Sequence, residues 1–269
     1  MKLNAFLSFI FLIVHFNYLG AEEVVSTGDS HPVLIVGETH GTNEFPAVIR
    51  RYASGDRVLI GLEIPHSEQQ SIDRYLQSDG TASDRMAILS GEFWQPTRLQ
   101  DGRSSAAVLD LIEFVRQRRH AGLAVGIFAF DIDQLQGSLE LILPGKVNWT
   151  SERDAMMANQ IEWNVRSYPG YQVVILVGSV HSILTRGAPW DPQYESMAYR
   201  LGRMIPVERI ALVHEGGTAW TCNGPSADQL TCGEHPAQPT KSSLRVSGAL
   251  SLGKLTAAKP ASFPEDKRN

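Results

Sequence analysis

The hydrophobic residues of this chain fall into short continuous runs that are rich in Val, Ile and Leu. Runs of this length are typical of strands that are buried on both faces of a parallel sheet. The predicted strands are Pro32–Glu38, Arg57–Ile64, Leu123–Asp131, Gln172–Gly178 and Glu208–Gly217.

Between these runs, apolar residues recur at helical spacing. One predicted helix is capped by Ser104 or Ser105 and followed by Gly122, and a second runs from about Glu152 to Arg166. Their apolar stripes are Val108, Leu111, Ile112 and Val115 in the first helix and Met157, Ile161 and Val165 in the second. Strands that alternate with helices imply right-handed crossovers, so we expect an α/β fold: an open three-layer α/β/α sandwich with a mostly parallel sheet.

The rest of the chain divides around this core. Residues 67–103 carry two further helical patterns and no strand pattern, which predicts a helical insertion covering one end of the sheet. Residues 241–269 are rich in Ser, Ala, Lys and Pro without lasting periodicity, and we expect a disordered tail there. Residues 22–240 then form a single domain, because a chain of 269 residues, 43% of them hydrophobic, is ample for one core.

The first 21 residues have the features of a secretory signal peptide. Lys2 precedes an apolar stretch from Ala5 to Phe16, and the small residues Gly20 and Ala21 follow it. We expect cleavage after Ala21 and a periplasmic or secreted protein that meets the membrane only through this segment; an uncleaved anchor is the alternative. The net charge of −5 and the absence of a basic stretch exclude a nucleic-acid partner.

The chain has only two cysteines, Cys222 and Cys232, in a segment rich in Gly and Pro. Export to an oxidising compartment predicts a structural disulfide between them. Closing this loop would stabilise the fold by about 2 to 3 kcal/mol, mainly by restricting the unfolded chain. A metal site is the weaker alternative, because only His235 lies nearby to support it.

Polar residues gather where the predicted strands end. Open α/β sheets bind ligands in the crevice at the carboxyl ends of their strands, so these residues are candidates for a functional site. They are Glu38 and His40, Glu63, Asp131 and Asp133, His181, and His214 with Glu215.

Two of the histidines end the same motif, an aliphatic run closed by Gly-x-x-His. The runs are LIVGETH, which ends at His40, and ILVGSVH, which ends at His181. If both are parallel strands, the two histidines leave the sheet on the same side. One such motif can be a plain strand-to-helix turn, but two at equivalent topological positions favour a site.

Glu63 strengthens this interpretation, because an unpaired carboxylate inside an apolar strand costs several kcal/mol. Its alternative is a buried ion pair with Arg50, Arg51 or Arg57. For the remaining candidates, structural roles compete with function. Asp131 and Asp133 are expected to cap the following segment. For His214, a ligand and a structural partner are equally expected. The surface or loops are the expected place of His31, His66, His120 and His235.

Arg153 is placed against its local electrostatic preference. Thr150 or Ser151 is the expected helix cap, with Asp154 completing a capping box three residues after Ser151. Arg153 then falls in the first helical turn, where the helix dipole disfavours a cation. We expect it to reach the carboxylates at the strand ends or a substrate oxyanion; a solvated arginine is the alternative.

These motifs resemble those of a known superfamily. GETHGTNEFP is similar to the first signature of the erythromycin-esterase-like, haem-binding ChaN-like and TraB/Tiki proteins. LEIP with Glu63, ERDAMMANQI with Arg153 and VGSVHS with His181 follow in the order that this group uses, so the resemblance spans Leu34 to Ser182.

The resemblance implies different activities for different members. Tiki-type members look like metal-dependent proteases, the esterases look like hydrolases whose first histidine is a general base on water, and ChaN-like members bind haem. Carried onto this chain, the implied catalytic residues are Glu38, His40, Glu63, Arg153 and His181. The helical region that shapes the macrolide cleft of the esterases does not fit this length, so macrolide hydrolysis is not expected.

The residue types allow a specific chemistry. His40, oriented by Glu38 or Glu63, can take a proton from water; Arg153 can stabilise an oxyanion and His181 can act as the acid. With a divalent metal, His40, His181 and Glu63 are the expected ligands. The leading hypothesis is a hydrolase acting on an ester, amide or peptide bond of a small molecule or peptide. A haem- or metal-binding carrier and a non-catalytic relative are the alternatives.

Overall fold

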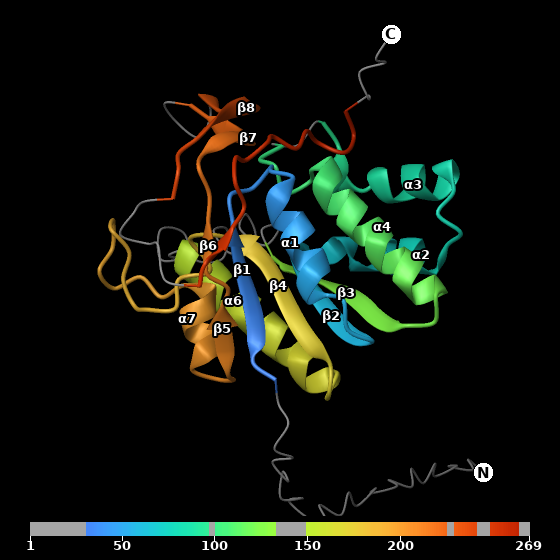
Figure 1. Ribbon diagram of the computed structural model, residues 1–269, viewed down its shortest axis with the longest axis horizontal. Helices are drawn as coiled ribbons and strands as arrows, with labels where there is room; N and C mark the ends of the chain where they lie inside the picture. Colours follow the sequence, from blue (N-terminus) through green and yellow to red (C-terminus); the bar gives the residue numbers. More distant parts are fainter. Residues whose placement is uncertain (1–30, 97–99, 133–148, 225–228, 241–247, 264–269) are drawn as a thin grey trace, which may run out of the picture.

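A five-stranded parallel sheet forms the centre of the fold (Figure 1). The computed structural model describes residues 31–96, 100–132, 149–224, 229–240 and 248–263. The strand order is β3-β2-β4-β1-β5, and all neighbours are parallel. The strands are β1 (Val33–Glu38), β2 (Arg57–Pro65), β3 (Ala124–Asp131), β4 (Gln172–Gly178) and β5 (Val207–Arg209).

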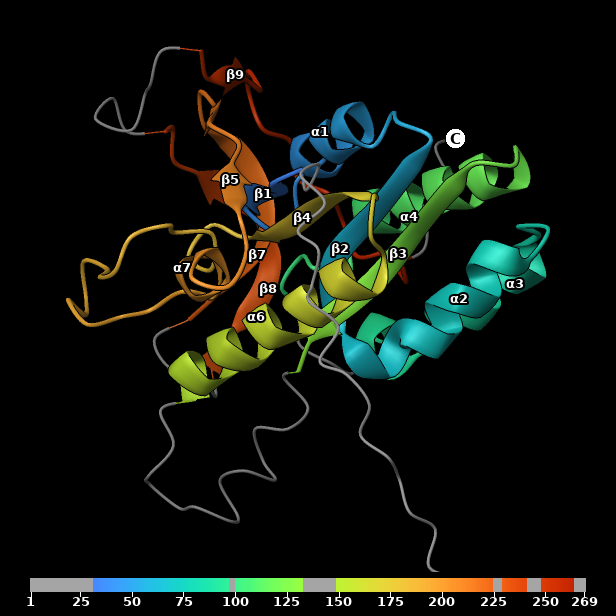
Figure 2. The ribbon, with the colours of Figure 1, turned by 90° about the horizontal axis from the view of Figure 1, so that it is seen from below.

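Helices cover both faces of this sheet, as Figure 2 shows. The helices α1 (Glu44–Tyr52) and α4 (Ala106–His120) pack on one face, and α6 (Trp149–Ser167) and α7 (Met197–Gly202) on the other. Successive side chains of a strand point to opposite faces. Val36 of β1 therefore packs in the core under α1 and α4, and Ile35 packs in the core under α6 and α7. The predicted three-layer α/β/α sandwich is confirmed.

The segment 67–103 is helical in its described part. It contains α2 (Gln69–Gln77), α3 (Ala82–Leu89) and the short 3-10 helix Glu92–Trp94, after a first 3-10 helix at His66–Glu68. The carboxamide of Gln69 donates to the carbonyl of Ile127 (3.0 Å) and accepts from the amide of Ala129 (2.6 Å). This side chain thus occupies backbone groups that the edge strand β3 would otherwise leave open.

The predicted fifth strand, Glu208–Gly217, is not a single strand. Only β5 joins the main sheet; β6 (Leu212–Val213) pairs with β9 (Leu250–Ser251), and β7 (Gly217–Asn223) forms an antiparallel hairpin with β8 (Thr231–Ala237). Gly216 and Gly217 have φ values of 84° and 134°, which turn the chain away from the sheet. His214 and Glu215 therefore do not extend a strand of the central sheet.

The prediction of disorder after Lys241 is wrong for residues 248–263. Leu255 and Ala258 are buried, and the backbone of Lys259 accepts a hydrogen bond from Ala106 at the start of α4. Backbone hydrogen bonds to helix starts leave no periodic pattern, which explains why composition was misleading here. Residues 241–247 and 264–269 lie outside the described residues, as does the predicted signal peptide.

The helix α6 starts earlier than predicted, at Trp149. Thr150 and Ser151 consequently lie inside the helix rather than at its cap, and Arg153 lies beyond the first turn. The cap of α4 is as expected, because the Ser105 hydroxyl accepts from the amide of Val108. Within the described ranges, no helix is both long and apolar enough to cross a membrane.

Candidate active site

The two Gly-x-x-His motifs interlock at the carboxyl ends of β1 and β4, which are adjacent strands. A Cβ atom on Gly178 would lie 2.8 Å from Nε2 of His40, and one on Gly37 would lie 2.1 Å from Oγ of Ser182. Gly178 therefore leaves the space that His40 fills, and Gly37 leaves the space that Ser182, the residue after His181, fills. This explains why glycine occupies the same place in both.

His40 lies in the turn between β1 and α1, and its ring is fixed by Glu38. Nδ1 is 2.9 Å from Oε1 of Glu38, and Nε2 faces Oε2 of Glu63 at 3.6 Å. The next residue, Gly41, has a φ of 68°, and a Cβ there would lie 2.1 Å from the carbonyl oxygen of Trp220. The His40 side chain is 23% exposed, which leaves it accessible to a small molecule.

Glu63 is the centre on which the site converges. Its Oε2 accepts a hydrogen bond from the amide of Gly178 (2.7 Å), and its Oε1 accepts one from Nη2 of Arg153 (2.8 Å). Oε1 also lies 3.9 Å from Nε2 of His181. The sequence anticipated a buried ion pair as one alternative, and an ion pair forms, but its partners are Arg153 and, at 3.7 Å, Arg103 rather than Arg50, Arg51 or Arg57.

Arg153 is held in place by Asp131, the last residue of β3. Asp131 is fully buried and accepts from Nε and Nη2 of Arg153, both at 2.8 Å, and from Nη1 of Arg103 at 2.5 Å. It also accepts from the amide of Ile132, the next residue, whereas the segment that Asp131 was predicted to cap lies outside the described residues. Asp133 lies outside the described residues. Arg153 therefore reaches the strand-end carboxylates, as predicted.

His181 is enclosed by α6 and α7. Its Nδ1 is 2.6 Å from Oδ1 of Asp154, which is fully buried and also accepts from the hydroxyl of Tyr194 (2.6 Å) and the amide of Met197 (2.9 Å). Nη1 of Arg153 lies 3.2 Å from Nε2 of His181. Because a guanidinium only donates, Nε2 accepts and Nδ1 carries the proton. Both ring nitrogens of His181 are therefore engaged by protein groups, an arrangement that does not suit the predicted acid role.

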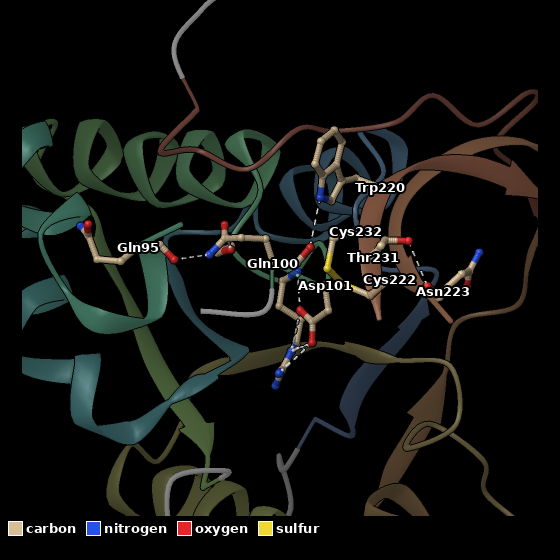
Figure 3. The surroundings of a disulfide bond; sticks show 10 residues. Gln95, Gln100, Asp101, Trp220, Cys222, Asn223, Thr231 and Cys232 are labelled. Atoms are coloured by element: carbon tan, nitrogen blue, oxygen red, sulfur yellow. Dashed lines mark hydrogen bonds and ion pairs between the residues drawn. A yellow bond between two sulfur atoms is a disulfide. The ribbon is translucent and has the colours of Figure 1, made fainter. Parts of the chain in front are cut away.

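The disulfide-bonded hairpin supports the His40 side of the site. Cys222 and Cys232 are bonded and face each other across β7 and β8, which confirms the predicted disulfide (Figure 3). The Trp220 amide donates to the carbonyl of Gly41 (2.8 Å), and the Trp220 indole donates to the carbonyl of Gln100 (3.1 Å).

The loop that follows Gln100 carries Asp101 and Arg103. Figure 3 shows this loop beside the hairpin, and Asp101 accepts from Nε of Arg103 at 2.9 Å. A Cβ on Gly102, whose φ is 96°, would lie 2.5 Å from both the amide nitrogen of Gly41 and the carbonyl oxygen of Trp220. The hairpin, the His40 turn and the Arg103 loop are therefore packed backbone to backbone.

The charges of the site shift the pKa values of its groups strongly. Burial alone would lower the pKa of His40, but the carboxylates of Glu63 and Glu38 outweigh it and raise that pKa to about 9. Burial would raise the pKa of Glu63, yet the positive charges of His40, Arg153 and Arg103 together hold it well below its usual range. His40 is therefore a cation and Glu63 an anion near neutral pH.

The structure thus brings together all five residues that the sequence proposed: Glu38, His40, Glu63, Arg153 and His181. His214 and Glu215 lie outside this cluster. The sequence did not identify Arg103, Asp154 and Tyr194. Asp154 had a signal, because it lies three residues before Met157 and seven before Ile161, on the apolar stripe of α6.

A divalent metal does not fit this arrangement. His40 and His181 both turn Nε2 toward Glu63, but the guanidinium of Arg153 binds Glu63 and His181 at the place where the ion would lie. In the described parts of the chain, no three His, Cys, Asp or Glu side chains are grouped so that they could hold a metal. Haem does not fit His181 either, because iron ligation requires a free ring nitrogen.

No protein-family model and no curated protein matches this chain, but solved structures share its fold. A mutant of the erythromycin esterase EreC in its open conformation is 15% identical, with a TM-score of 0.55 over 77% of this chain and 76% of that one. A Bacillus cereus protein is 11% identical with a TM-score of 0.51, covering 78% and 71%. A succinoglycan biosynthesis protein is 8% identical with a TM-score of 0.52, covering 77% and 72%. At these identities the likeness shows the fold alone, and it includes an erythromycin esterase, one of the groups that the sequence motifs resemble.

Proposed function

We propose that the protein is a hydrolase that activates water at His40 to cleave an ester, amide or peptide bond. The observation that carries this proposal is the state of the His40 ring. Glu38 fixes Nδ1, whereas the 3.6 Å between Nε2 and Glu63 is too long for a hydrogen bond. Nε2 can therefore bind a water molecule or a reacting group.

The reaction begins when His40 has lost its proton. Neutral Nε2 takes a proton from water while the oxygen of that water attacks the substrate carbonyl. Arg153 and Arg103, which are held by Asp131, lie on the other side of Glu63 and stabilise the oxyanion. The imidazolium of His40 then donates its proton to the leaving group as the bond to that group breaks, which restores neutral His40.

His181 acts on this reaction through Arg153. Asp154 holds Nδ1 of His181, so that Nε2 accepts from Nη1 of Arg153 and fixes the position of the guanidinium. This makes His181 a positioning residue. The assignment differs from the acid role that the residue type suggested.

The cellular setting and substrate belong to the same proposal. The disulfide supports an oxidising compartment and therefore an exported protein. The substrate is a small molecule or a peptide. The alternatives of a haem or metal carrier gain no support from the cluster, because the guanidinium of Arg153 lies against both Glu63 and His181.

A panel of p-nitrophenyl esters, anilides and short peptides tests the proposal. The wild type should hydrolyse a member of the panel in buffer that contains EDTA, and His40→Gln should lower kcat/KM by about 10²- to 10⁴-fold. His120→Gln is the matched control, because His120 is exposed at the end of α4. Hydrolysis that survives His40→Gln, or that appears only when a divalent metal is added, would contradict the mechanism.

A further inference from the structure

A cavity of about 530 Å³ borders the site at the edge of the sheet formed by β1 and β5. Its lining includes Glu38 and Ser179, at the ends of β1 and β4, together with Arg209 and His214. This volume lies in the range of small-molecule pockets. Because Glu38 also holds the ring of His40, the cavity and the reaction site share a wall.

Arg209 is the cation of this cavity. It makes no hydrogen bond or ion pair with any residue in the described part of the chain. Its Nη2 lies close over Gly37, because a Cβ there would be 3.3 Å away. Although the residue as a whole is exposed, burial lowers the pKa of its guanidinium. A partly desolvated guanidinium without a partner gains from an incoming anion.

His214 adds a neutral donor to the same cavity. Its Nδ1 accepts a hydrogen bond from the amide of Gly216 (3.3 Å), and burial lowers its pKa. The neutral ring consequently carries its proton on Nε2, which is a donor. The ring lies at 76° to that of Phe45, with 6.2 Å between the centroids, and Phe45 also lines the cavity.

The charges of the lining favour an anion. Among the described residues that line the cavity, Glu38 is the only carboxylate, and its charge is offset by the imidazolium of His40. The remaining polar side chains of the lining are those of Thr39, Ser179, Gln238 and Thr240, which are uncharged.

We propose that the cavity between Arg209 and His214 binds an anionic group, a carboxylate or a phosphate, of the substrate whose scissile bond lies at His40. The inference rests on the proposed function only in taking the bound molecule to be the substrate. Binding of an anion at this site does not depend on that function. Arg209 is the specificity-determining residue, and His214 orients the anion.

Calorimetry on the full chain at low ionic strength tests the site without any reaction. The probes are benzoate, phenyl phosphate and the neutral benzamide. We expect at least one of the two anions to bind about tenfold more tightly than benzamide. Arg209→Gln should weaken the binding of that anion by about tenfold or more. Comparing benzoate with phenyl phosphate distinguishes a carboxylate site from a phosphate site.

Two further variants fix the interpretation. Arg209→Lys keeps the charge and should retain most of the binding, and Arg51→Gln removes an exposed arginine of α1 and should change nothing. No anion binding at millimolar concentration, equal binding of benzamide, or unchanged binding by Arg209→Gln would each overturn the inference.

A kinetic arm separates this inference from the proposed function. A p-nitrophenyl ester that ends in a carboxylate should have a lower KM than a neutral ester of the same length, and Arg209→Gln should remove the difference while kcat stays within about threefold. If both esters are cleaved with the same KM in wild type and variant, the hydrolase stands and the anion site fails. If no ester is cleaved but Arg209-dependent anion binding persists, the hydrolase fails and the site stands.

Discussion

The two halves of the site carry the same motif but differ in their surroundings. His40 is 23% exposed, has one nitrogen on Glu38, and keeps the other free of a hydrogen bond. His181 is 11% exposed and has both nitrogens engaged, one by Asp154 and one by Arg153. The shared Gly-x-x-His motif therefore places one ring where it can react and the other where it supports a guanidinium. The motif determines location, and the second partner of each ring determines its role.

The largest expected effect separates the two histidines. His40→Gln should lower kcat/KM by about 10²- to 10⁴-fold, because the general base is lost. His181→Gln should lower it by about tenfold, yet cost about 1 to 3 kcal/mol of stability, since the buried Asp154 loses a partner. Ester kinetics and urea unfolding of both variants measure the contrast. If the two variants lose activity equally and their unfolding free energies do not differ, the two histidines do not have the different roles assigned to them.

Stability should depend on pH through His40. Its pKa in the folded protein is raised from 6.5 to about 9, so its stabilising effect is fully present below about pH 6.5 and is lost as the pH rises through about 9. The shift corresponds to about 3 kcal/mol. Urea unfolding between pH 6 and 10 should show this decline in the wild type and not in His40→Gln. A decline of the same size in the variant would assign it to other groups.

The disulfide should affect the His40 half alone. Replacing Cys222 and Cys232 together by Ser should lower the unfolding free energy by about 2 to 3 kcal/mol. Because the hairpin donates to the backbone of Gly41, activity should fall several-fold while the His181 ring keeps its environment. Imidazole nitrogen NMR of the double variant checks this. A change in the signals of His181 without one in those of His40 would contradict the prediction.

A smaller effect is expected when Asp154 becomes Asn. The carboxylate holds the proton of His181 on Nδ1, and an amide can instead donate to that nitrogen. The proton would then move to Nε2, against Arg153, and kcat/KM should fall by about threefold. NMR should show the tautomer change. The positioning role of His181 would be wrong if the tautomer changes and the rate does not.

The sequence predicted the central sheet well because buried parallel strands have a strong pattern. It failed where short-range pattern carries little information. The edge strand β5 is only three residues long, so its continuation to Gly217 looked like one strand. Leu255 is buried through a segment held by backbone hydrogen bonds, which composition does not record.

The site was predictable where strand ends supply it. Glu38, His40, Glu63 and His181 follow or end strands, and the topology alone brings them to one edge. Arg103 comes from a loop whose path depends on Gly102 and Trp220, so no local pattern could place it. Asp154 was interpreted as a capping residue because the helix was expected to begin at about Glu152, whereas α6 begins at Trp149.

The most direct test of the account is the pH dependence of kcat/KM for the most rapidly cleaved ester of the panel. If neutral His40 is the base, kcat/KM should rise about tenfold per pH unit and level off near pH 9, and Glu38→Gln should move this limb to lower pH, because the carboxylate at Nδ1 is lost. A profile that is flat from pH 6 to 10, or one that falls as the pH rises from 6 to 9, would contradict His40 as the base.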